Sequence, residues 1–511
     1  MPDSNKDTKK VVKNTFYLYL RMLIIMCVNL YTVRIVLYML GEEDYGINNV
    51  VAGVVAMFSF LTNTLASGSQ RFFAFELGQK DVLKLNEYFN ATLLCYTILS
   101  ILFVVLAETI GLWFVENKLT IPESREGAAF FIYQFAVIQF VFRLFVVPHM
   151  SVIMAREQMN IYAIVSVLES ALTLFSAFVL QAVPWDKLKT YSCLLFISTM
   201  IPSMIYIVYS KNRFPETQIT FRVKKDMVIE LISYCGWNLI GTLSGMFRSH
   251  GMNILLNVFF TPVVNAARAV AYQVSKAVNE LSHSFFSAVR PQITKTYAAG
   301  DASNMIELVY MSSRLCFFLM WIFSLPLIFE IPLVLNLWLK EVPEDTILFT
   351  RLVIINALID SLAHPLMSAV QATGNIRNYQ LITGGVLILT LPIAYFFLKI
   401  GCPPQVTMYV SIAISIVAQI IRIVFAKIQI NMDVEAYVKN VIIRICAVIL
   451  LSSIVPMILH TFVIKEILRF FVVVGCSMVF NSIIIWIFGL QKSERKSIVK
   501  TIRTRIKNEN C

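Results

Sequence analysis

Six basic residues lie deep within long apolar runs of this 511-residue sequence, where a charged side chain needs a specific role. They are Arg21, Arg34, Arg143, Arg248, Arg268 and Lys276. A charge at membrane depth costs at least ~2.5–3.5 kcal/mol on insertion scales. Arginine stays charged there and binds phosphate oxygens through two parallel hydrogen bonds. We therefore expect these residues to line a cationic, hydrated cavity for an anionic group.

Several of these positions also admit a structural explanation near a membrane surface. Arg21 lies seven residues into its predicted helix and can extend its guanidinium to the cytoplasmic interface. Arg34 can reach the outer surface, or pair with Glu42 or Asp44. For these two residues the binding role and the structural role both stay open.

The other basic residues differ in how easily a structural role explains them. Lys276 and Glu280 are four residues apart, the spacing at which side chains neutralise each other on one helix face. Arg268 lies near the outer end of its predicted helix, which allows a role at the rim of the cavity. Arg143 and Arg248 are hardest to explain by extension to a surface, so we expect them to pair internally or to face the cavity.

A second set of ionisable residues is suited to binding an ion or a proton. Asp360 lies in an apolar run with His364 one turn further along, and Glu169 is a second acidic candidate. The alternative for each carboxylate is a fixed structural pair with a basic neighbour.

Signatures of soluble catalysis are missing from the sequence. It contains no H-E-x-x-H, no G-x-x-x-x-G-K-[ST] and no G-x-S-x-G motif. The five histidines lack metal-ligand spacing, and none of the nine cysteines form a C-x-x-C pair. We expect no enzymatic activity, no metal and no cofactor.

The elements that must position these residues are membrane helices. Hydrophobic residues make up 58% of the chain and charged residues only 14%, against about 25% in soluble domains. Apolar runs of spanning length recur along the whole chain. We predict an all-α integral membrane protein of about fourteen transmembrane helices, at 14–40, 47–77, 89–115, 128–155, 161–181, 188–210, 227–260, 263–298, 306–335, 346–372, 379–400, 406–427, 436–460 and 467–490.

The net charge of +12 is placed as the positive-inside rule requires, so we expect no nucleic-acid partner. Lys and Arg collect in every second connecting segment, including both ends of the chain, and acidic residues collect in the others. Both termini should therefore be cytoplasmic. The long predicted helix 263–298 carries a polar stripe at helical spacing, which must face protein or water rather than lipid.

The two halves of the chain repeat each other. Pro148-x-Met150-Ser151 recurs as Pro365-x-Met367-Ser368, an offset of 217 residues that also relates Arg143 to Asp360. We predict two pseudo-symmetric six-helix lobes, at 1–210 and 227–428, joined by a cytoplasmic linker at 211–226. Two extra helices and a basic cytoplasmic tail follow at 429–511.

The N-terminal segments resemble a known family. Asn14–Met22 (NTFYLYLRM), Val33–Leu37 (VRIVL), Leu40–Val50 (LGEEDYGINNV) and Ser69–Gly78 (SQRFFAFELG) look like the start of polysaccharide or O-antigen flippases. These belong to the multidrug/oligosaccharidyl-lipid/polysaccharide exporter superfamily. The resemblance is strongest over the first half of the chain and implies two six-helix lobes around a central cavity, with alternating access.

From this resemblance we expect a flippase that moves a polyprenyl-diphosphate-linked oligosaccharide, such as an O-antigen or capsule repeat unit. Its expected partners are the lipid-linked glycan, membrane lipid and other glycan-assembly proteins, in a bacterial cytoplasmic (inner) membrane. One alternative is a cation-coupled multidrug exporter of the same superfamily, which a net-basic cavity disfavours. The other is a membrane-embedded glycan polymerase or glycosyltransferase.

Overall fold

The computed structural model describes residues 4–495, with gaps at 57, 120, 221–222, 261, 340–341, 344, 463–465 and 493. Every regular element in this part of the chain is a helix, which confirms the all-α prediction. The chain forms two compact units, one of Asn14–Leu239 and one of Ile240–Cys511 with Met1–Lys13. We call them the first and the second unit. The basic tail predicted from Lys496 onward lies outside the described residues.

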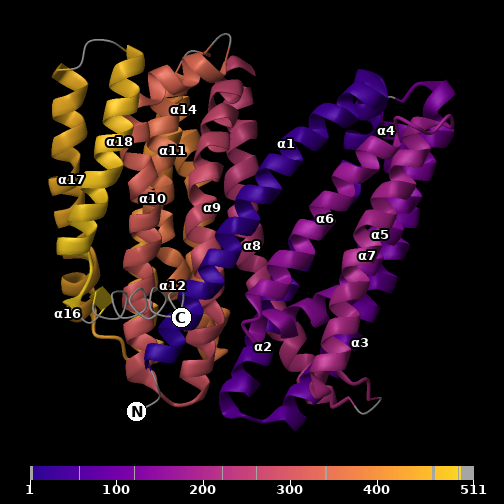
Figure 1. Ribbon diagram of the computed structural model, residues 1–511, viewed down its shortest axis with the longest axis horizontal. Coiled ribbons are helices and arrows are strands. Elements are labelled where there is room, and N and C mark those ends of the chain that lie inside the picture. The colour runs from indigo at the N-terminus through magenta and orange to yellow at the C-terminus, as the bar shows by residue number, and fades with distance from the viewer. Residues whose placement is uncertain are drawn as a thin grey trace, which may run out of the picture. The chain divides into compact units, whose positions relative to one another are not determined.

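The first unit is built mainly from long helices that lie side by side, together with the short helix α4 (Figure 1). They are α1 (Ser4–Ala56), α2 (Ser59–Gln79), α3 (Val82–Leu106), α4 (Leu112–Lys118), α5 (Glu126–Ala155), α6 (Met159–Val179) and α7 (Lys187–Arg213). The side chain of Asp81 caps α3 by accepting from the Lys84 amide at 2.9 Å. Gly41 breaks α1 into two helical stretches, because its φ of 78° lies outside the helical region.

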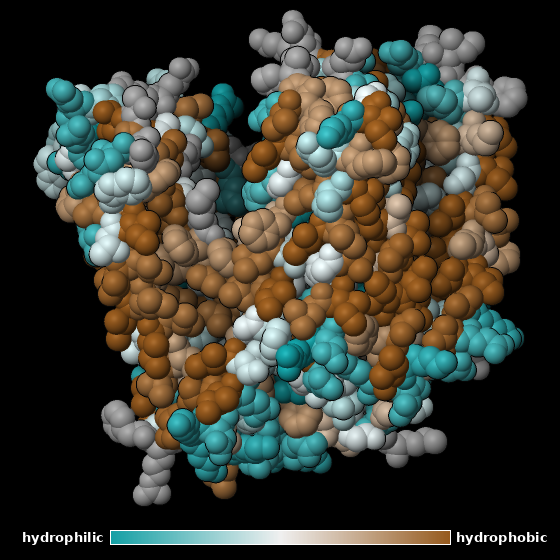
Figure 2. Space-filling view, turned by 180° about the vertical axis from the view of Figure 1, so that it is seen from behind, coloured by the Kyte–Doolittle hydropathy of each residue, from teal (hydrophilic) through white to brown (hydrophobic). Residues whose placement is uncertain are grey.

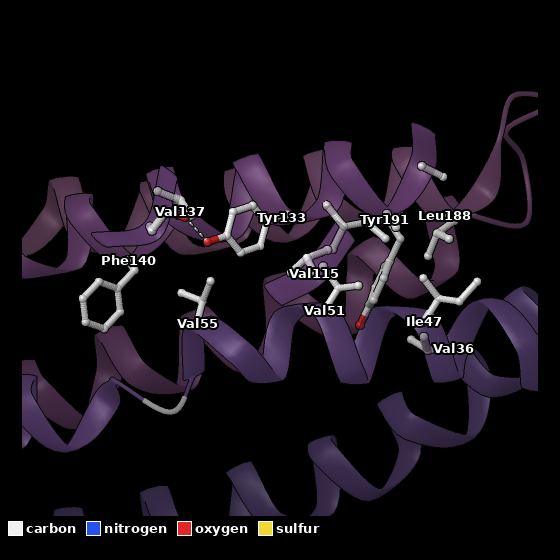
Figure 3. Packing of buried hydrophobic residues seen from close by; sticks show 14 of the residues in the cluster. Val36, Ile47, Val51, Val55, Val115, Tyr133, Val137, Phe140, Leu188 and Tyr191 are labelled. Atoms are coloured by element: carbon white, nitrogen blue, oxygen red, sulfur yellow. Dashed lines mark hydrogen bonds between the residues drawn. The ribbon is translucent and has the colours of Figure 1, made fainter. Parts of the chain in front are cut away.

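The core of the first unit packs around α5 (Figure 3). Val51 and Val55 of α1 lie in the same buried cluster as Tyr133 and Val137 of α5. The Tyr133 hydroxyl donates to the Ala107 carbonyl at 2.7 Å. The only polar atom of the Tyr133 side chain therefore has a hydrogen-bond partner within the apolar cluster. Apolar packing and this bond together hold α5 at the centre of the unit.

The second unit contains the remaining helices, several of them short. They are α8 (Lys225–Phe259), which begins in the first unit, α9 (Pro262–Ala298), α10 (Ala302–Trp338), α11 (Thr346–Ser361), α12 (Ala363–Thr373), α13 (Arg377–Ile388), α14 (Thr390–Lys399), α15 (Val406–Ile430), α16 (Val434–Tyr437), α17 (Ile443–Phe462) and α18 (Glu466–Ile484). The predicted span 346–372 is broken at Leu362, three residues before Pro365. Such a break agrees with the inability of proline to complete the helical hydrogen bonds behind it.

The same helix pairs pack against each other in both units. In the first unit α2 packs on α3 and α5, and α5 and α6 pack on α7. In the second unit α9 packs on α10 and α11, and α11 and α13 pack on α15. This correspondence supports the two-lobe prediction, with Pro148 in α5 matching Pro365 at the start of α12. The extra helices α17 and α18 pack on α10 (Figure 1).

Eleven helices among the described residues are long and apolar enough to cross a membrane, or twelve if the bent pair Asp44–Val55 and Ser59–Gln79 forms one span. The predicted count of about fourteen is therefore not confirmed. Helices α8 and α9 have 35 and 37 residues, which is sufficient length, but they carry charged residues within the helix: Arg248 in α8, and Arg268 and Lys276 in α9. On both units apolar side chains cover the sides and polar ones gather at the ends (Figure 2), as in a multi-pass membrane protein.

Candidate functional site

Arg248, on α8 of the second unit, is held by uncharged groups of α11 and α15. One guanidinium nitrogen, Nη2, lies 3.3 Å from Asn356 Oδ1, 3.1 Å from the Ser411 carbonyl and 3.0 Å from Ser415 Oγ. No carboxylate of the described residues forms an ion pair with Arg248. Its positive charge is positioned by neutral dipoles, which leaves it available to an anion.

Asn356 links this cation to the acidic candidate Asp360. The Asn356 Nδ2 atom donates to Asp360 Oδ2 at 2.9 Å, while Asn356 Oδ1 accepts from Ser415 at 3.0 Å and from Arg248. The amide thus uses its donor side for the anion and its acceptor side for the cation. Sequence reasoning missed Asn356, although its position one turn before Asp360 on the same helix is a usable signal.

Arg268, on α9, is buried beside the next part of α8. Its side chain is only 3% exposed, and it donates to Asn253 Oδ1, to the Ser249 carbonyl at 3.4 Å and to the Tyr272 hydroxyl at 3.3 Å. The guanidinium carbon also lies 4.5 Å from the centre of the Tyr272 ring. Ser249 directly follows Arg248 in α8, so the carbonyl group that binds Arg268 belongs to the residue next to Arg248. All the acceptors are uncharged here too.

In the first unit, two residues predicted for separate roles form one ion pair. Arg143 Nη2 on α5 lies 2.5 Å from Glu169 Oε1 on α6, with side chains 52% and 31% exposed. This is the internal pairing considered for Arg143 and the structural pair considered for Glu169. The contact compensates the charge of Arg143, in contrast to the two arginines of the second unit.

Arg21 is bound inside the first unit instead of extending along its own helix. Its Nε donates to Ser166 Oγ at 2.7 Å, and its guanidinium carbon lies 4.7 Å from the centre of the Tyr162 ring. The Tyr206 hydroxyl in turn donates to the Tyr162 carbonyl at 3.2 Å. Helices α6 and α7 therefore fix the position of this cation through neutral groups.

The structure brings neither Arg34 nor Lys276 into a cluster. Both side chains are exposed, and neither forms an ion pair with any described residue. Asp44, a predicted partner of Arg34, instead pairs with Arg125 at 2.7 Å, and the Glu42 side chain lies outside the described residues. Lys276 and Glu280 share a helix face without contact in the structure.

Asp360 and His364, expected to form one ion or proton site, have different surroundings. Asp360 belongs to α11 and contacts Asn356, while His364 belongs to α12 and stacks on Phe286 with ring centres 5.7 Å apart. The two residues lie on either side of the interruption at Leu362, whose backbone stays in the right-handed helical region with φ −72° and ψ −18°, and their side chains contact different neighbours. Within the described ranges, no three His, Cys, Asp or Glu residues are grouped as metal ligands.

Solved structures with a similar fold are known, although the sequence matches no protein-family model and no curated protein. An outward-facing multidrug resistance MATE family transporter of the MOP superfamily gives a TM-score of 0.72 at 14% identity, covering 84% of this chain and 98% of that chain. A MATE structure in the bent conformation gives 0.71 at 15% identity, covering 84% and 98%. At these identities the likeness concerns the fold.

The description of a third similar structure refers to the polarity of that protein's binding pocket. It is a MOP superfamily transporter from Pyrococcus furiosus, described as having a binding pocket of reverse polarity that suggests a different function. Its TM-score is 0.70 at 15% identity, with 84% of this chain and 96% of that chain covered. The fold is thus the one expected from the motifs of the N-terminal segments.

Proposed function

We propose that this chain, which has the fold of MATE family transporters, moves a polyprenyl-diphosphate-linked oligosaccharide across the cytoplasmic membrane by alternating access. The observation that carries the proposal is the uncompensated charge of Arg248 and Arg268. Both guanidinium groups are positioned by neutral acceptors, and Arg268 is almost fully buried. A buried cation without a carboxylate partner is costly, so an anionic substrate group offsets a penalty that the empty protein bears.

A diphosphate suits this arrangement better than a cationic drug does. Phosphate oxygens accept several charge-assisted hydrogen bonds, and guanidinium groups present donors in a matching planar fork. Arg268 donates to the carbonyl group of Ser249, the residue that follows Arg248 in α8, and in this proposal one extended anion contacts both arginines. In this proposal the polyprenyl tail stays in the lipid while the charged headgroup crosses.

The second candidate is a cation-coupled multidrug exporter, favoured by the multidrug resistance transporter among the similar folds. Asp360 supports it locally, because among the described residues its carboxylate is bound only by the neutral Asn356. The Arg143–Glu169 pair in the first unit favours neither substrate. Charge at the site therefore separates the two candidates: the first needs the arginines and the second needs the carboxylate.

The deciding experiment is flipping in proteoliposomes that contain a fluorescent diphosphate-linked sugar lipid. Protection from a membrane-impermeant quencher measures transfer between leaflets. We expect Arg248→Gln and Arg268→Gln to lower the flipping rate at least tenfold. The matched control is Arg351→Gln, which removes another membrane arginine of the second unit that donates to the Ile328 carbonyl at 3.0 Å.

The same vesicles test the alternative with a fluorescent organic cation. Two results together would assign the multidrug function. The wild-type protein would export the cation and Asp360→Asn would not, and Arg248→Gln and Arg268→Gln would flip the sugar lipid at the wild-type rate. Thermal unfolding of each variant checks that the protein in the vesicles is folded, so that the transport rates of folded proteins are compared.

A further inference from the structure

A second group of basic side chains lies about two turns further along α15 than Ser415, the residue that contacts Arg248. Arg290 belongs to α9 and Arg422 to α15, and α12, which carries His364, packs against both helices. Arg290 Nη2 lies 3.3 Å from Oε1 of Gln371 on α12. These contacts place parts of α9, α12 and α15 around one set of basic groups.

Arg422 has a guanidinium edge with no partner in the described part of the chain. The residue is 7% exposed, and neither Nε nor Nη1 has a hydrogen-bond acceptor. The buried Tyr379, on α13, places its hydroxyl beside the same guanidinium group. Buried hydrogen-bond donors almost always have an acceptor in native proteins. The Nε and Nη1 edge of Arg422 is therefore a candidate binding site for an acceptor group.

The neighbours of His364 are also basic. Its ring stacks on Phe286, and Arg290, Arg422 and His283 lie close enough to act on it electrostatically. No described carboxylate forms an ion pair with His364 or Arg422. The buried guanidinium edge of Arg422 without an acceptor destabilises the empty protein, and an anion bound there removes that cost.

Helix dipoles do not account for the cluster. Helix C-termini attract cations, but the effect falls off within the last turn. Arg422 lies eight residues before the end of α15 at Ile430, and Arg290 lies eight before the end of α9 at Ala298. Both are more than two turns away from the carbonyl groups that carry the partial negative charge.

The cluster also has a route to the surface. The His283 side chain is exposed, those of Arg290 and His364 are half-buried, and that of Arg422 is buried. Along α9, His283 and Arg290 are separated by about two turns on the same face. An anion can therefore approach along α9 and end at the unpartnered edge of Arg422.

We propose that Arg422, Arg290 and His364 form an anion site that binds a phosphate group. The group comes either from a phospholipid headgroup or from free diphosphate, which have the same oxygen chemistry. The site is distinct from the Arg248 and Arg268 pair and does not depend on the proposed function.

The test uses purified full-length Arg248→Gln protein in neutral detergent, so that binding at Arg248 does not obscure the result. Inorganic diphosphate and a short-chain phosphatidate are titrated separately by calorimetry, with a short-chain phosphatidylcholine, whose headgroup is zwitterionic, as the net-neutral reference. We expect saturable binding of a phosphate probe. Adding Arg422→Gln should weaken it at least tenfold, whereas adding Arg351→Gln should leave it unchanged.

Thermal unfolding gives an independent readout. Without any anion, Arg422→Gln should unfold at the same or a higher temperature than its parent, because a buried guanidinium edge without an acceptor is gone. The phosphate probe should raise the unfolding temperature of the parent but not that of the variant. Binding of diphosphate alone assigns a free anion, and binding of phosphatidate alone assigns a lipid headgroup.

Two results would overturn the site: no binding of either probe by the parent, or equal affinities with and without Arg422. If Arg422→Gln does not fold, His364→Gln and Arg422→Lys replace it, with a loss expected for the first and retention for the second. Loss of flipping in Arg248→Gln with intact phosphate binding would separate this site from the transport site.

Discussion

Arg248 and Asp360 are joined through one side-chain amide, that of Asn356, which accepts from the first and donates to the second. The two charges are therefore coupled without direct contact. A substrate anion that draws the Arg248 side chain toward itself changes the hydrogen bonds of Asn356, and through them the surroundings of Asp360. This gives the second unit a physical route from substrate binding to an acidic group.

The first prediction removes this amide. Asn356→Leu preserves the approximate side-chain volume but removes the donor to Asp360 and one of the three acceptors of Arg248, which keeps Ser411 and Ser415. We expect the free energy of unfolding to fall by about 1–3 kcal/mol, the usual cost of a buried polar group that loses its hydrogen bond. Denaturant unfolding in detergent measures this, with Asn375→Leu as an exposed control; equal stability of the two variants would show that Asn356 has no such role.

A second prediction concerns the Arg143–Glu169 pair. The two groups form an ion pair between α5 and α6, so a double-mutant cycle should give a coupling free energy on the order of 0.5–3 kcal/mol, the range for residues in contact. The exchanged variant Arg143→Glu with Glu169→Arg should recover the stability that either single reversal loses. Unfolding temperatures of the four proteins check this, and no recovery in the exchanged variant would mean that the partners act separately.

The C-terminal helices provide a third prediction. Glu330 of α10 is 1% exposed and is bound by His460 Nδ1 at 3.0 Å and by Arg469 Nε at 3.2 Å, from α17 and α18. Glu330→Gln removes the charge that compensates Arg469, and loss of one partner of a buried pair costs roughly 3–5 kcal/mol. We expect a large drop in unfolding temperature, and proteolysis of α17 and α18 before the rest of the chain.

The matched control for this change is Glu466→Gln. Glu466 begins α18 and is exposed, with no ion pair among the described residues. It should alter stability by less than about 0.5 kcal/mol, as most surface substitutions do. Similar effects of the two variants would show that α17 and α18 are not held by the Glu330 contacts.

The fourth prediction tests the close packing at Gly111 in the first unit. A Cβ atom added there would lie 2.1 Å from the Tyr133 hydroxyl, which is bonded to Ala107, whereas a Cβ at Gly127 meets nothing within 4 Å. Gly111→Ala should therefore destabilise the protein by about 1–3 kcal/mol, the usual cost of overpacking. Gly127→Ala should be neutral or slightly stabilising, and Tyr133→Phe should relieve part of the Gly111→Ala defect; thermal unfolding distinguishes these outcomes.

Much of the fold could be predicted because it depends on composition and local spacing. The apolar runs define the helices whatever their partners are, since backbone groups in lipid must be satisfied within each segment. The recurrence of the Pro148 motif at Pro365 predicts two similar lobes, and the structure repeats the same helix packing in both. The span count was less predictable, since α8 and α9 are long helices with charged residues in their interior.

The sequence by itself determined that membrane helices of this chain carry arginines whose burial requires compensation. Only the tertiary structure decided how each is compensated: Arg143 by Glu169, Arg248 and Arg268 by neutral groups, and Arg422 in part by no described group. The physical reason is that the partners lie on helices distant in sequence. Which side chains meet depends on the rotation and depth of each helix, and those are set by packing across the whole unit.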